Sequence, residues 1–290
     1  MYEKILVATD LSPASDEVIK CLGGLRTIGA QEIILTHALG IRHLDDMRHE
    51  LLRLAEPALE RQRAALEEQG FAACIRAPRG LPTEEILRVA EEQKVELIVA
   101  GSHGHALAHD VLLGSTPIEL LHRSPLPVLI LRVKVEGERE RPQCGAVDCG
   151  ALTDRILYAT DFSDNADLAF AHLKRFVESG AKAVTLLHVQ DLARIGAVKP
   201  ETLAEFDRLD EERLERRRAE LTKLGSAKVD CVIARGHATE EILKISRQGA
   251  SLVILGSQGK GFFKEVFLGS TSHNVARHAP CPVLVVPQPR

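Results

Sequence analysis

Short apolar segments alternate along the chain with longer segments whose apolar residues recur every three or four positions. In the first half, the apolar runs are residues 4–10, 32–39, 72–78, 97–102 and 127–133. In the second half, they are residues 155–161, 183–190, 229–235, 252–257 and 282–287. Runs that are apolar without strict alternation suit strands buried on both faces, and intervening helices favour right-handed parallel connections. The pattern therefore predicts an α/β fold with five parallel strands in each half.

The segment after the first run is predicted to be a helix that covers the sheet. Ser12 is a candidate N-cap, and Pro13 suits the first helical position because its missing N–H has no partner there. The apolar residues along one face are Ala14, Val18, Leu22 and Leu25. We expect this face to pack against the strands.

Residues 45–70 and 201–224 combine helical periodicity with many charges, which we interpret as solvent-exposed faces. Pro57 predicts a kink or a restart in the first of these helices, because proline removes a backbone hydrogen bond. The apolar stripe of this helix is Leu52, Ala55, Leu59 and Leu66.

The second half of the chain repeats the first. Residues 4–12, KILVATDLS, are matched by residues 155–163, RILYATDFS. Three further motifs recur in the same order. LTHA is matched by LLHV, RG before EEIL recurs unchanged, and GSHG before GST is matched by GSQG before GST. Self-similarity of this kind indicates a duplicated domain.

The length of 290 residues and the hydrophobic content of 45% agree with two domains. The segment between the copies is charged, then contains glycine and cysteine, and lacks apolar periodicity, which is typical of a linker. We predict a first domain over residues 1–134, a linker over residues 135–151 and a second domain over residues 152–290.

Charge and hydropathy narrow the range of partners. A formal net charge of -4 and a pI near 6.3 leave no global basic field, so nucleic acid is not expected as a main partner. The chain starts MYEK and runs directly into an apolar strand, without the basic and long apolar regions of a signal peptide, and no apolar run approaches membrane-spanning length. We expect a cytoplasmic protein without membrane contact.

The six cysteines are spread thinly, and no disulfide framework is expected. Cys144 and Cys149 lie in the linker, where two thiols are too few for a zinc site of four ligands, so we interpret them as unpaired and leave their role open. The cysteines interpreted as small hydrophobic residues of helices or strands are Cys21, Cys74, Cys231 and Cys281.

The chemistry-bearing residues follow the predicted strands. Asp10 and Asp161 close the first strand of each copy, and ligands of open parallel sheets bind beyond the carboxyl ends of strands. Each copy also has the spacing Gly-x2-Gly-x9-Gly-Ser after its fourth strand. Glycines let backbone N–H groups approach an anion, and a helix N-terminus adds unpaired donors. The spacing predicts a phosphate-binding site in each half, although glycines after strands also serve in tight turns alone.

Other motifs are not favoured. The glycine pattern is neither a Walker A loop nor the dinucleotide-binding pattern after a first strand. His103-Gly104-His105 is similar to a nucleotidyltransferase signature, but it follows the fourth strand instead of the first, so adenylyl transfer is not favoured. We interpret His37 and His188, at matching strand ends, as structural residues bound by nearby backbone.

Together these motifs resemble the universal stress protein family, over both halves and nearly the whole chain outside the linker. The resemblance implies a flavodoxin-like fold, related to the adenine nucleotide alpha hydrolases, with strand order 3-2-1-4-5. It implies ATP as the ligand, alone or with Mg²⁺ bridging its phosphates. The glycine motif would hold phosphates and ribose, the aspartate the nucleoside portion, and the backbone at the end of the second strand the adenine.

The site residues that the resemblance implies fall at matching places in the two copies. In the first half they are Asp10, Ala38, Gly101, Gly104, Gly114, Ser115 and Thr116. In the second half they are Asp161, Val189, Gly256, Gly259, Lys260, Gly269, Ser270 and Thr271.

The two loops differ in charge. His105 and His109 of the first loop stand where the second has Lys260 and Lys264. Lysine is cationic at neutral pH, whereas an unperturbed histidine, with a pKa of about 6.5, is mostly neutral. Our hypothesis is that the second half holds ATP more tightly; the alternative is that these side chains point to solvent and contribute nothing.

The expected function is a nucleotide-responsive regulator of the stress response, in which ATP shifts a conformation or oligomer that an unidentified protein partner recognises. A slow ATP hydrolase would need a positioned base, and the sequence indicates none. A structural module with vestigial nucleotide sites is the third alternative. The apolar closing strands, residues 127–133 and 282–287, invite pairing, and the resemblance implies dimers; a pseudo-dimer of the two halves and a homodimer both remain open.

Overall fold

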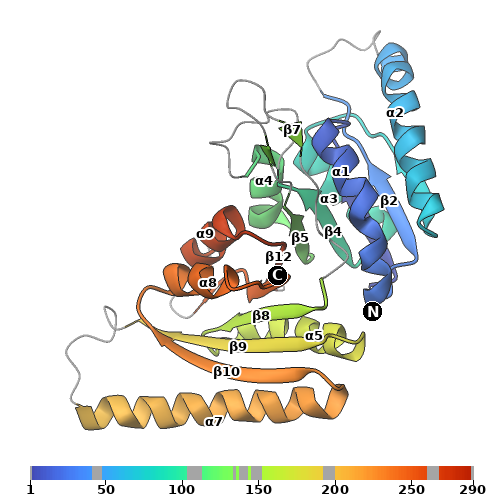
Figure 1. Ribbon diagram of the computed structural model, residues 1–290. Coiled ribbons are helices and arrows are strands. Elements are labelled where there is room, and N and C mark those ends of the chain that lie inside the picture. The colour runs from blue at the N-terminus through green and yellow to red at the C-terminus, as the bar shows by residue number, and fades with distance from the viewer. Residues whose placement is uncertain are drawn as a thin grey trace. The chain divides into compact units, whose positions relative to one another are not determined.

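The computed structural model describes residues 2–40, 48–102, 113–132, 135–136, 143–144, 152–191, 200–259 and 268–288. The chain divides into two compact units, residues 1–150 and 151–290, and each is a helix-covered parallel sheet (Figure 1). In the described part of the chain, no helix combines the length and the apolar character needed to cross a membrane.

The sheet of the first unit has the order β3-β2-β1-β4-β5, with every pairing parallel. Its strands are β1 (Lys4–Ala8), β2 (Glu32–Thr36), β3 (Ala72–Arg76), β4 (Leu97–Gly101) and β5 (Val128–Leu131). Its helices are α1 (Pro13–Cys21), the 3-10 helix η1 (Leu22–Ile28), α2 (Arg48–Glu68), α3 (Pro82–Gln93) and α4 (Ser115–Arg123). Within the predicted linker, β6 (Val135–Glu136) and β7 (Gln143–Cys144) form a short antiparallel pair that the sequence did not predict.

The second unit repeats this topology with the order β10-β9-β8-β11-β12. Its strands are β8 (Arg155–Thr160), β9 (Ala183–Gln190), β10 (Lys228–Arg235), β11 (Leu252–Gly256) and β12 (Val283–Val286). Its helices are α5 (Asp164–Glu178), α7 (Pro200–Leu224), α8 (Ala238–Ser246) and α9 (Ser270–His278). Both units confirm the expected strand order 3-2-1-4-5.

Helices cover both faces of each sheet. In the second unit, α5 and α7 pack together on one face and α8 and α9 on the other (Figure 1). The first strand of each unit therefore marks the point where the chain switches from one face to the other, which brings β8 beside β11 and β1 beside β4. The carboxyl ends of these neighbouring strands form the crevice in which open α/β sheets bind ligands.

The predicted start of α1 is confirmed. Ser15 N–H donates to Ser12 Oγ at 3.2 Å, and Pro13 is the first helical residue. The helix ends at Cys21 and continues as η1, and the four apolar residues of its predicted face are all buried.

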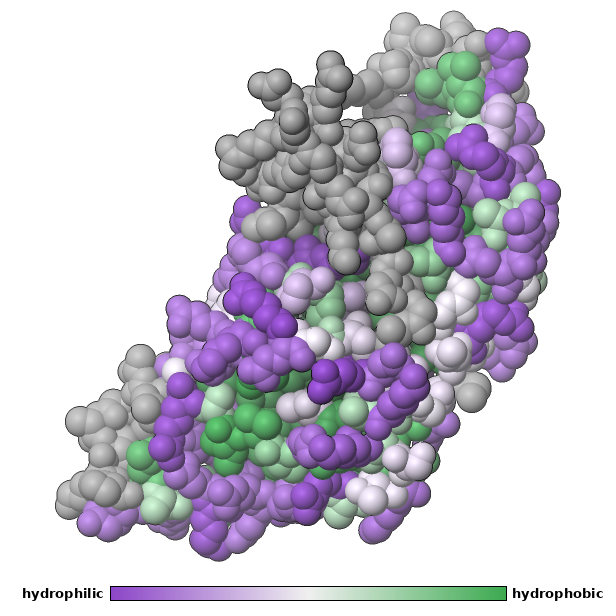
Figure 2. Space-filling model, viewed as in Figure 1, coloured by the Kyte–Doolittle hydropathy of each residue, from purple (hydrophilic) through white to green (hydrophobic). Residues whose placement is uncertain are grey.

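The two charge-rich helices are also confirmed. Pro57 lies inside the continuous helix α2, so the helix does not restart there. Hydrophilic side chains dominate the visible face of α7 (Figure 2), in agreement with the predicted solvated face.

The interpretation of Cys21 as only a small hydrophobic residue of its helix is wrong. Cys21 is disulfide-bonded, whereas Cys74, Cys231 and Cys281 are free. The side chains of the other two cysteines, Cys144 and Cys149, lie outside the described residues. Cys21 ends α1, and β7 packs near this helix. Sequence spacing carries no signal for such a pairing, because cysteines far apart in the chain meet only after folding.

Candidate functional site

A pocket opens at the carboxyl end of the second sheet, where β8 and β11 lie side by side. Its walls come from strand ends, from the turn at residues 256–259 after β11, called the glycine turn below, and from the first turns of α5, α8 and α9. Of the site residues predicted in the second half, those that line this pocket are Asp161, Val189, Gly256, Gly259, Gly269, Ser270 and Thr271. Lys260, predicted in the same turn, lies outside the described residues, as does Lys264.

One end of the pocket is formed by Asp161 and the glycine turn. A Cβ atom added at Gly259 would lie 2.5 Å from Asp161 Oδ2, so the turn passes directly against the carboxylate, and a side chain at this position would force the turn or the carboxylate to move. Asp161 Oδ1 accepts a hydrogen bond from Ser163 N at 3.0 Å. Two segments almost a hundred residues apart in sequence thus meet at one point.

Between Asp161 and its helix, the backbone takes a strained turn in both units. Phe162 has φ 58° and Leu11, at the same place in the first unit, has φ 65°. Each donates its N–H to the threonine two residues earlier, Phe162 to Thr160 Oγ1 at 3.0 Å and Leu11 to Thr9 Oγ1 at 3.1 Å. Non-glycine residues in the left-handed region cost energy and persist where the surrounding structure enforces them, commonly at ligand sites.

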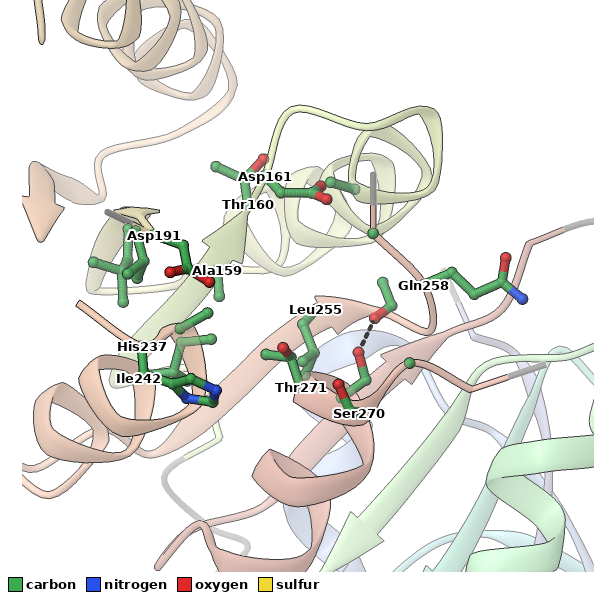
Figure 3. Close-up of a pocket in the computed structure, with 18 residues that line it drawn as sticks. Ala159, Thr160, Asp161, Asp191, His237, Ile242, Leu255, Gln258, Ser270 and Thr271 are labelled. Carbon is green, nitrogen blue, oxygen red and sulfur yellow. Dashed lines mark hydrogen bonds between the residues drawn. The ribbon is translucent and has the colours of Figure 1, made fainter. Parts of the chain in front are cut away.

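Gly269 and Ser270, the second Gly-Ser pair of the motif, lie at the start of α9 beside the glycine turn. Gly269 is the N-cap of α9 and donates its N–H to Ser257 O at 2.7 Å. Ser272 Oγ donates to Gly256 O at 2.7 Å, the dashed line in Figure 3, and this bond joins the first turn of α9 to the end of β11. The N-terminus of a helix, with its unpaired N–H groups and its positive dipole end, favours an anion.

The middle of the pocket is apolar and its other end is polar. Ala159, Leu187, Ile242 and Leu255 are among the apolar residues that line it. Val189 follows along β9, and beyond it lie two polar side chains that the sequence analysis missed.

These two side chains are Asp191, just after β9, and His237, just before α8, and both lie away from Gln258 in Figure 3. The internal repeat could not point to these two residues, because the two copies carry different residues at these positions. In the second unit Gly236 N–H donates to Gln190 O at 3.1 Å, and in the first Gly80 N–H donates to Leu39 O at the same distance. These matching bonds pair Asp191 with Gly40 and His237 with Leu81.

The first unit places its described site residues equivalently. Asp10 follows β1, Ala38 follows β2, and Gly101 ends the neighbouring strand β4. Gly114 is the N-cap of α4 and donates its N–H to Ser102 O at 2.9 Å, as Gly269 does to Ser257. Ser115 and Thr116 begin the helix. Gly104 lies outside the described residues, with His105 and His109, so the predicted difference between the two loops stays a prediction.

The matching histidines are held by backbone, as predicted. His37 Nδ1 lies 2.9 Å from Thr9 O, and His188 Nδ1 lies 2.8 Å from Thr160 O. The imidazoles therefore act as donors to the strand ends that carry the aspartates. His188 Nε2 also lies 3.4 Å from the buried carboxylate of Asp210 on α7.

Comparisons with known proteins agree with this architecture. A model of the universal stress protein family matches residues 1–132 and 153–287. A universal stress protein of Methanocaldococcus jannaschii is 29% identical over 157 residues, which are 46% of this chain and 97% of that protein. One of Mycolicibacterium smegmatis is 26% identical over 296 residues, 97% of this chain and 96% of that protein. The crystal structure of a universal stress protein from Archaeoglobus fulgidus has a TM-score of 0.75 and 28% identity, covering 99% of this chain and 98% of that one.

Proposed function

The chain belongs to the universal stress protein family, and from this premise we propose that it binds adenine nucleotide, ATP in particular, and acts as a nucleotide-responsive regulator. The observation that carries the proposal is the contact between Asp161 and Gly259 at one end of the pocket, beside the N-terminus of α9. A carboxylate beside an amide-lined turn offers separate places for sugar hydroxyls and for phosphates.

In the proposed complex, the phosphates bind at the glycine turn and the first turn of α9. Gly256, Gly259 and Gly269 let the ligand approach the backbone closely, and the hydroxyls of Ser270 and Thr271 donate further hydrogen bonds. Lys260 adds a cation by the sequence prediction. Mg²⁺ binds phosphate oxygens and usually keeps several waters, so in this proposal it would bridge the phosphates of the bound ATP.

The adenine and the ribose occupy the rest of the pocket in this proposal. The apolar side chains between Ala159 and Ile242 suit a planar ring, since small-molecule sites are mostly apolar with a few polar groups that fix orientation. The backbone at Val189 pairs with the edge of the base, and Asp161 accepts from the ribose hydroxyls. In the first unit, Asp10 and Ala38 take the same roles.

We favour regulation over turnover because of where the titratable side chains lie. Hydrolysis needs a base that positions water at the terminal phosphate. Among the described residues that line the pocket, Asp191 and His237 lie at the end away from the glycine turn, and Asp161 is in contact with the turn itself. In the proposed mechanism, ATP stabilises one conformation or oligomer, a pseudo-dimer of the halves or a homodimer, that a protein partner recognises.

The test is to identify the resident ligand and to follow its fate. Mass spectrometry of the purified full chain should detect adenine nucleotide, and calorimetric titration should give tighter binding of ATP than of GTP. A phosphate-release assay run beside it should show ATP unchanged over many hours. A chain that binds no adenine nucleotide contradicts the proposal, and steady turnover at a saturable rate would make the protein an ATP hydrolase instead.

A further inference from the structure

We propose that Asn165 is a positioning residue that holds the glycine turn of the second half in shape for the phosphates, and that its absence at the same place in the first half makes the two nucleotide sites unequal. This inference rests on the proposed function, because it concerns how the same pocket holds its ligand.

Asn165 joins three segments that meet at the phosphate end of the pocket. It is the second residue of α5, four residues after Asp161, and is 4% exposed. Its Oδ1 accepts hydrogen bonds from Gln258 N at 2.7 Å and from Ser257 Oγ at 3.4 Å, and its Nδ2 donates to Val286 O at 3.3 Å. One buried amide therefore ties the start of α5 to the ends of β11 and β12.

The fit between the turn and this amide is close. A Cβ atom added at Gly256 would lie 2.5 Å from Asn165 Oδ1 and 3.0 Å from Asn165 O. Gly256 is thus a glycine because Asn165 occupies the space beside it. Gln258, whose N–H is held by Asn165, lies directly before Gly259, which contacts Asp161. The hydrogen bonds of Asn165 therefore set the path of the turn up to the Asp161 carboxylate.

The first half has a different arrangement at the same place. Ser12 and Ser163 are equivalent N-caps, so Ala14 corresponds to Asn165 and Ser15 to Ala166. Ala14 is fully buried and its methyl group can make no hydrogen bond. Ser15 Oγ instead donates to Asp10 Oδ1 at 2.7 Å. The polar side chain in the first turn of the helix binds the aspartate in the first half and the glycine turn in the second.

Preorganisation explains why this difference matters for binding. A turn that is already held in its bound shape pays less ordering entropy when an anion arrives. Removing Asn165 would also leave the Gln258 N–H without its buried acceptor, which costs more than the bond itself contributes. Because the substitution changes only the phosphate end of the pocket, the affinity for a ligand without phosphates should hardly change.

The experiment compares ATP with adenosine in the full chain. Calorimetric titration gives the affinities, and ligand-induced protection from hydrogen exchange, read in peptides from the start of α1 and the start of α5, assigns each binding event to its half. We expect Asn165→Ala to weaken ATP binding by the second half about tenfold while changing adenosine binding less than about twofold. Ser246→Ala is the matched control, since it removes another buried hydrogen bond of the same unit, from Ser246 Oγ to Leu243 O at 2.8 Å, away from the turn.

A second variant changes Gly256, the residue of the turn that packs against Asn165. Gly256→Ala pushes a methyl group against Asn165 Oδ1, and its effect on ATP affinity should be smaller in the Asn165→Ala chain than in the wild type. Equal losses of ATP and adenosine affinity in Asn165→Ala, no loss of either, or additive effects of the two substitutions would overturn the inference. If the wild-type chain binds neither ligand, the proposed function itself fails.

Discussion

Asp161 and Gly259 lie against each other although 97 intervening residues separate them in the chain, and a methyl group at Gly259 would sit 2.5 Å from Asp161 Oδ2. The contact joins the two parts of the proposed site, which are the carboxylate after β8 and the turn after β11. A side chain at position 259 could be accommodated only if the turn or the carboxylate moved.

The first prediction tests this contact directly. Gly259→Ala should weaken ATP binding to the second half by about tenfold, or about 1.4 kcal/mol, because the methyl group displaces either the turn or the carboxylate. Gly40→Ala is the control, since a Cβ at Gly40 has no neighbouring atom within 4 Å among the described residues. Titration calorimetry of both variants checks the expectation. Equal affinities in Gly259→Ala and in the control would show that the contact does not shape the ligand site.

The disulfide of Cys21 leads to a prediction about stability. Reduction, or the substitution Cys21→Ser, should lower the free energy of unfolding by about 2–4 kcal/mol, since a cross-link restricts the unfolded chain. Urea unfolding with and without a dithiol reductant measures the change. Cys74→Ser is the control, because Cys74 is a free thiol. A Cys21→Ser chain that still loses stability on reduction would contradict the assignment.

Much of the fold could be predicted because the strands are buried on both faces. All residues of β5 and most of β4 and β1 are buried, and such strands appear in the sequence as continuous apolar runs. The edge strands β3 and β10 are only half-buried but still carry enough apolar residues to be recognised. Strand order came from the family resemblance, because periodicity does not tell which strands are neighbours.

The residues predicted for the candidate site come mostly from positions at which the two copies agree. The aspartates and glycines recur at equivalent strand ends, so the repeat itself draws attention to them. Asn165, Asp191 and His237 differ between the copies and were missed. Their proposed roles depend on contacts between segments that are far apart in the chain, which sequence spacing does not encode. Their counterparts in the first half are Ala14, Gly40 and Leu81.

A pH effect on stability follows from His172. Burial, reinforced by the charge of Arg175, lowers the pKa of His172 to about 4. The unfolded chain, with an ordinary histidine pKa of about 6.5, therefore binds more protons than the folded chain between these values, and stability must fall as the pH is lowered through this window. The contribution lost between neutral pH and about pH 4 is about 3 kcal/mol. Urea unfolding of wild type and His172→Gln across this range should show the smaller decrease in the variant; parallel curves would contradict the prediction.

Selection of the base should depend on Asp191 and His237, the polar pair at the end of the pocket away from the glycine turn. A site that hydrogen-bonds one base leaves its own polar groups unpaired when another base enters, and this penalty is the main source of discrimination. Replacing the pair by the residues of the first half, Asp191→Gly with His237→Leu, removes these groups without touching the phosphate end. We expect the ratio of ATP to GTP affinity in the second half to fall, while the affinity for inorganic triphosphate stays the same. Competition titrations with the two nucleotides measure the ratio, and an unchanged ratio would mean that both side chains face solvent in the complex and that the backbone alone reads the base.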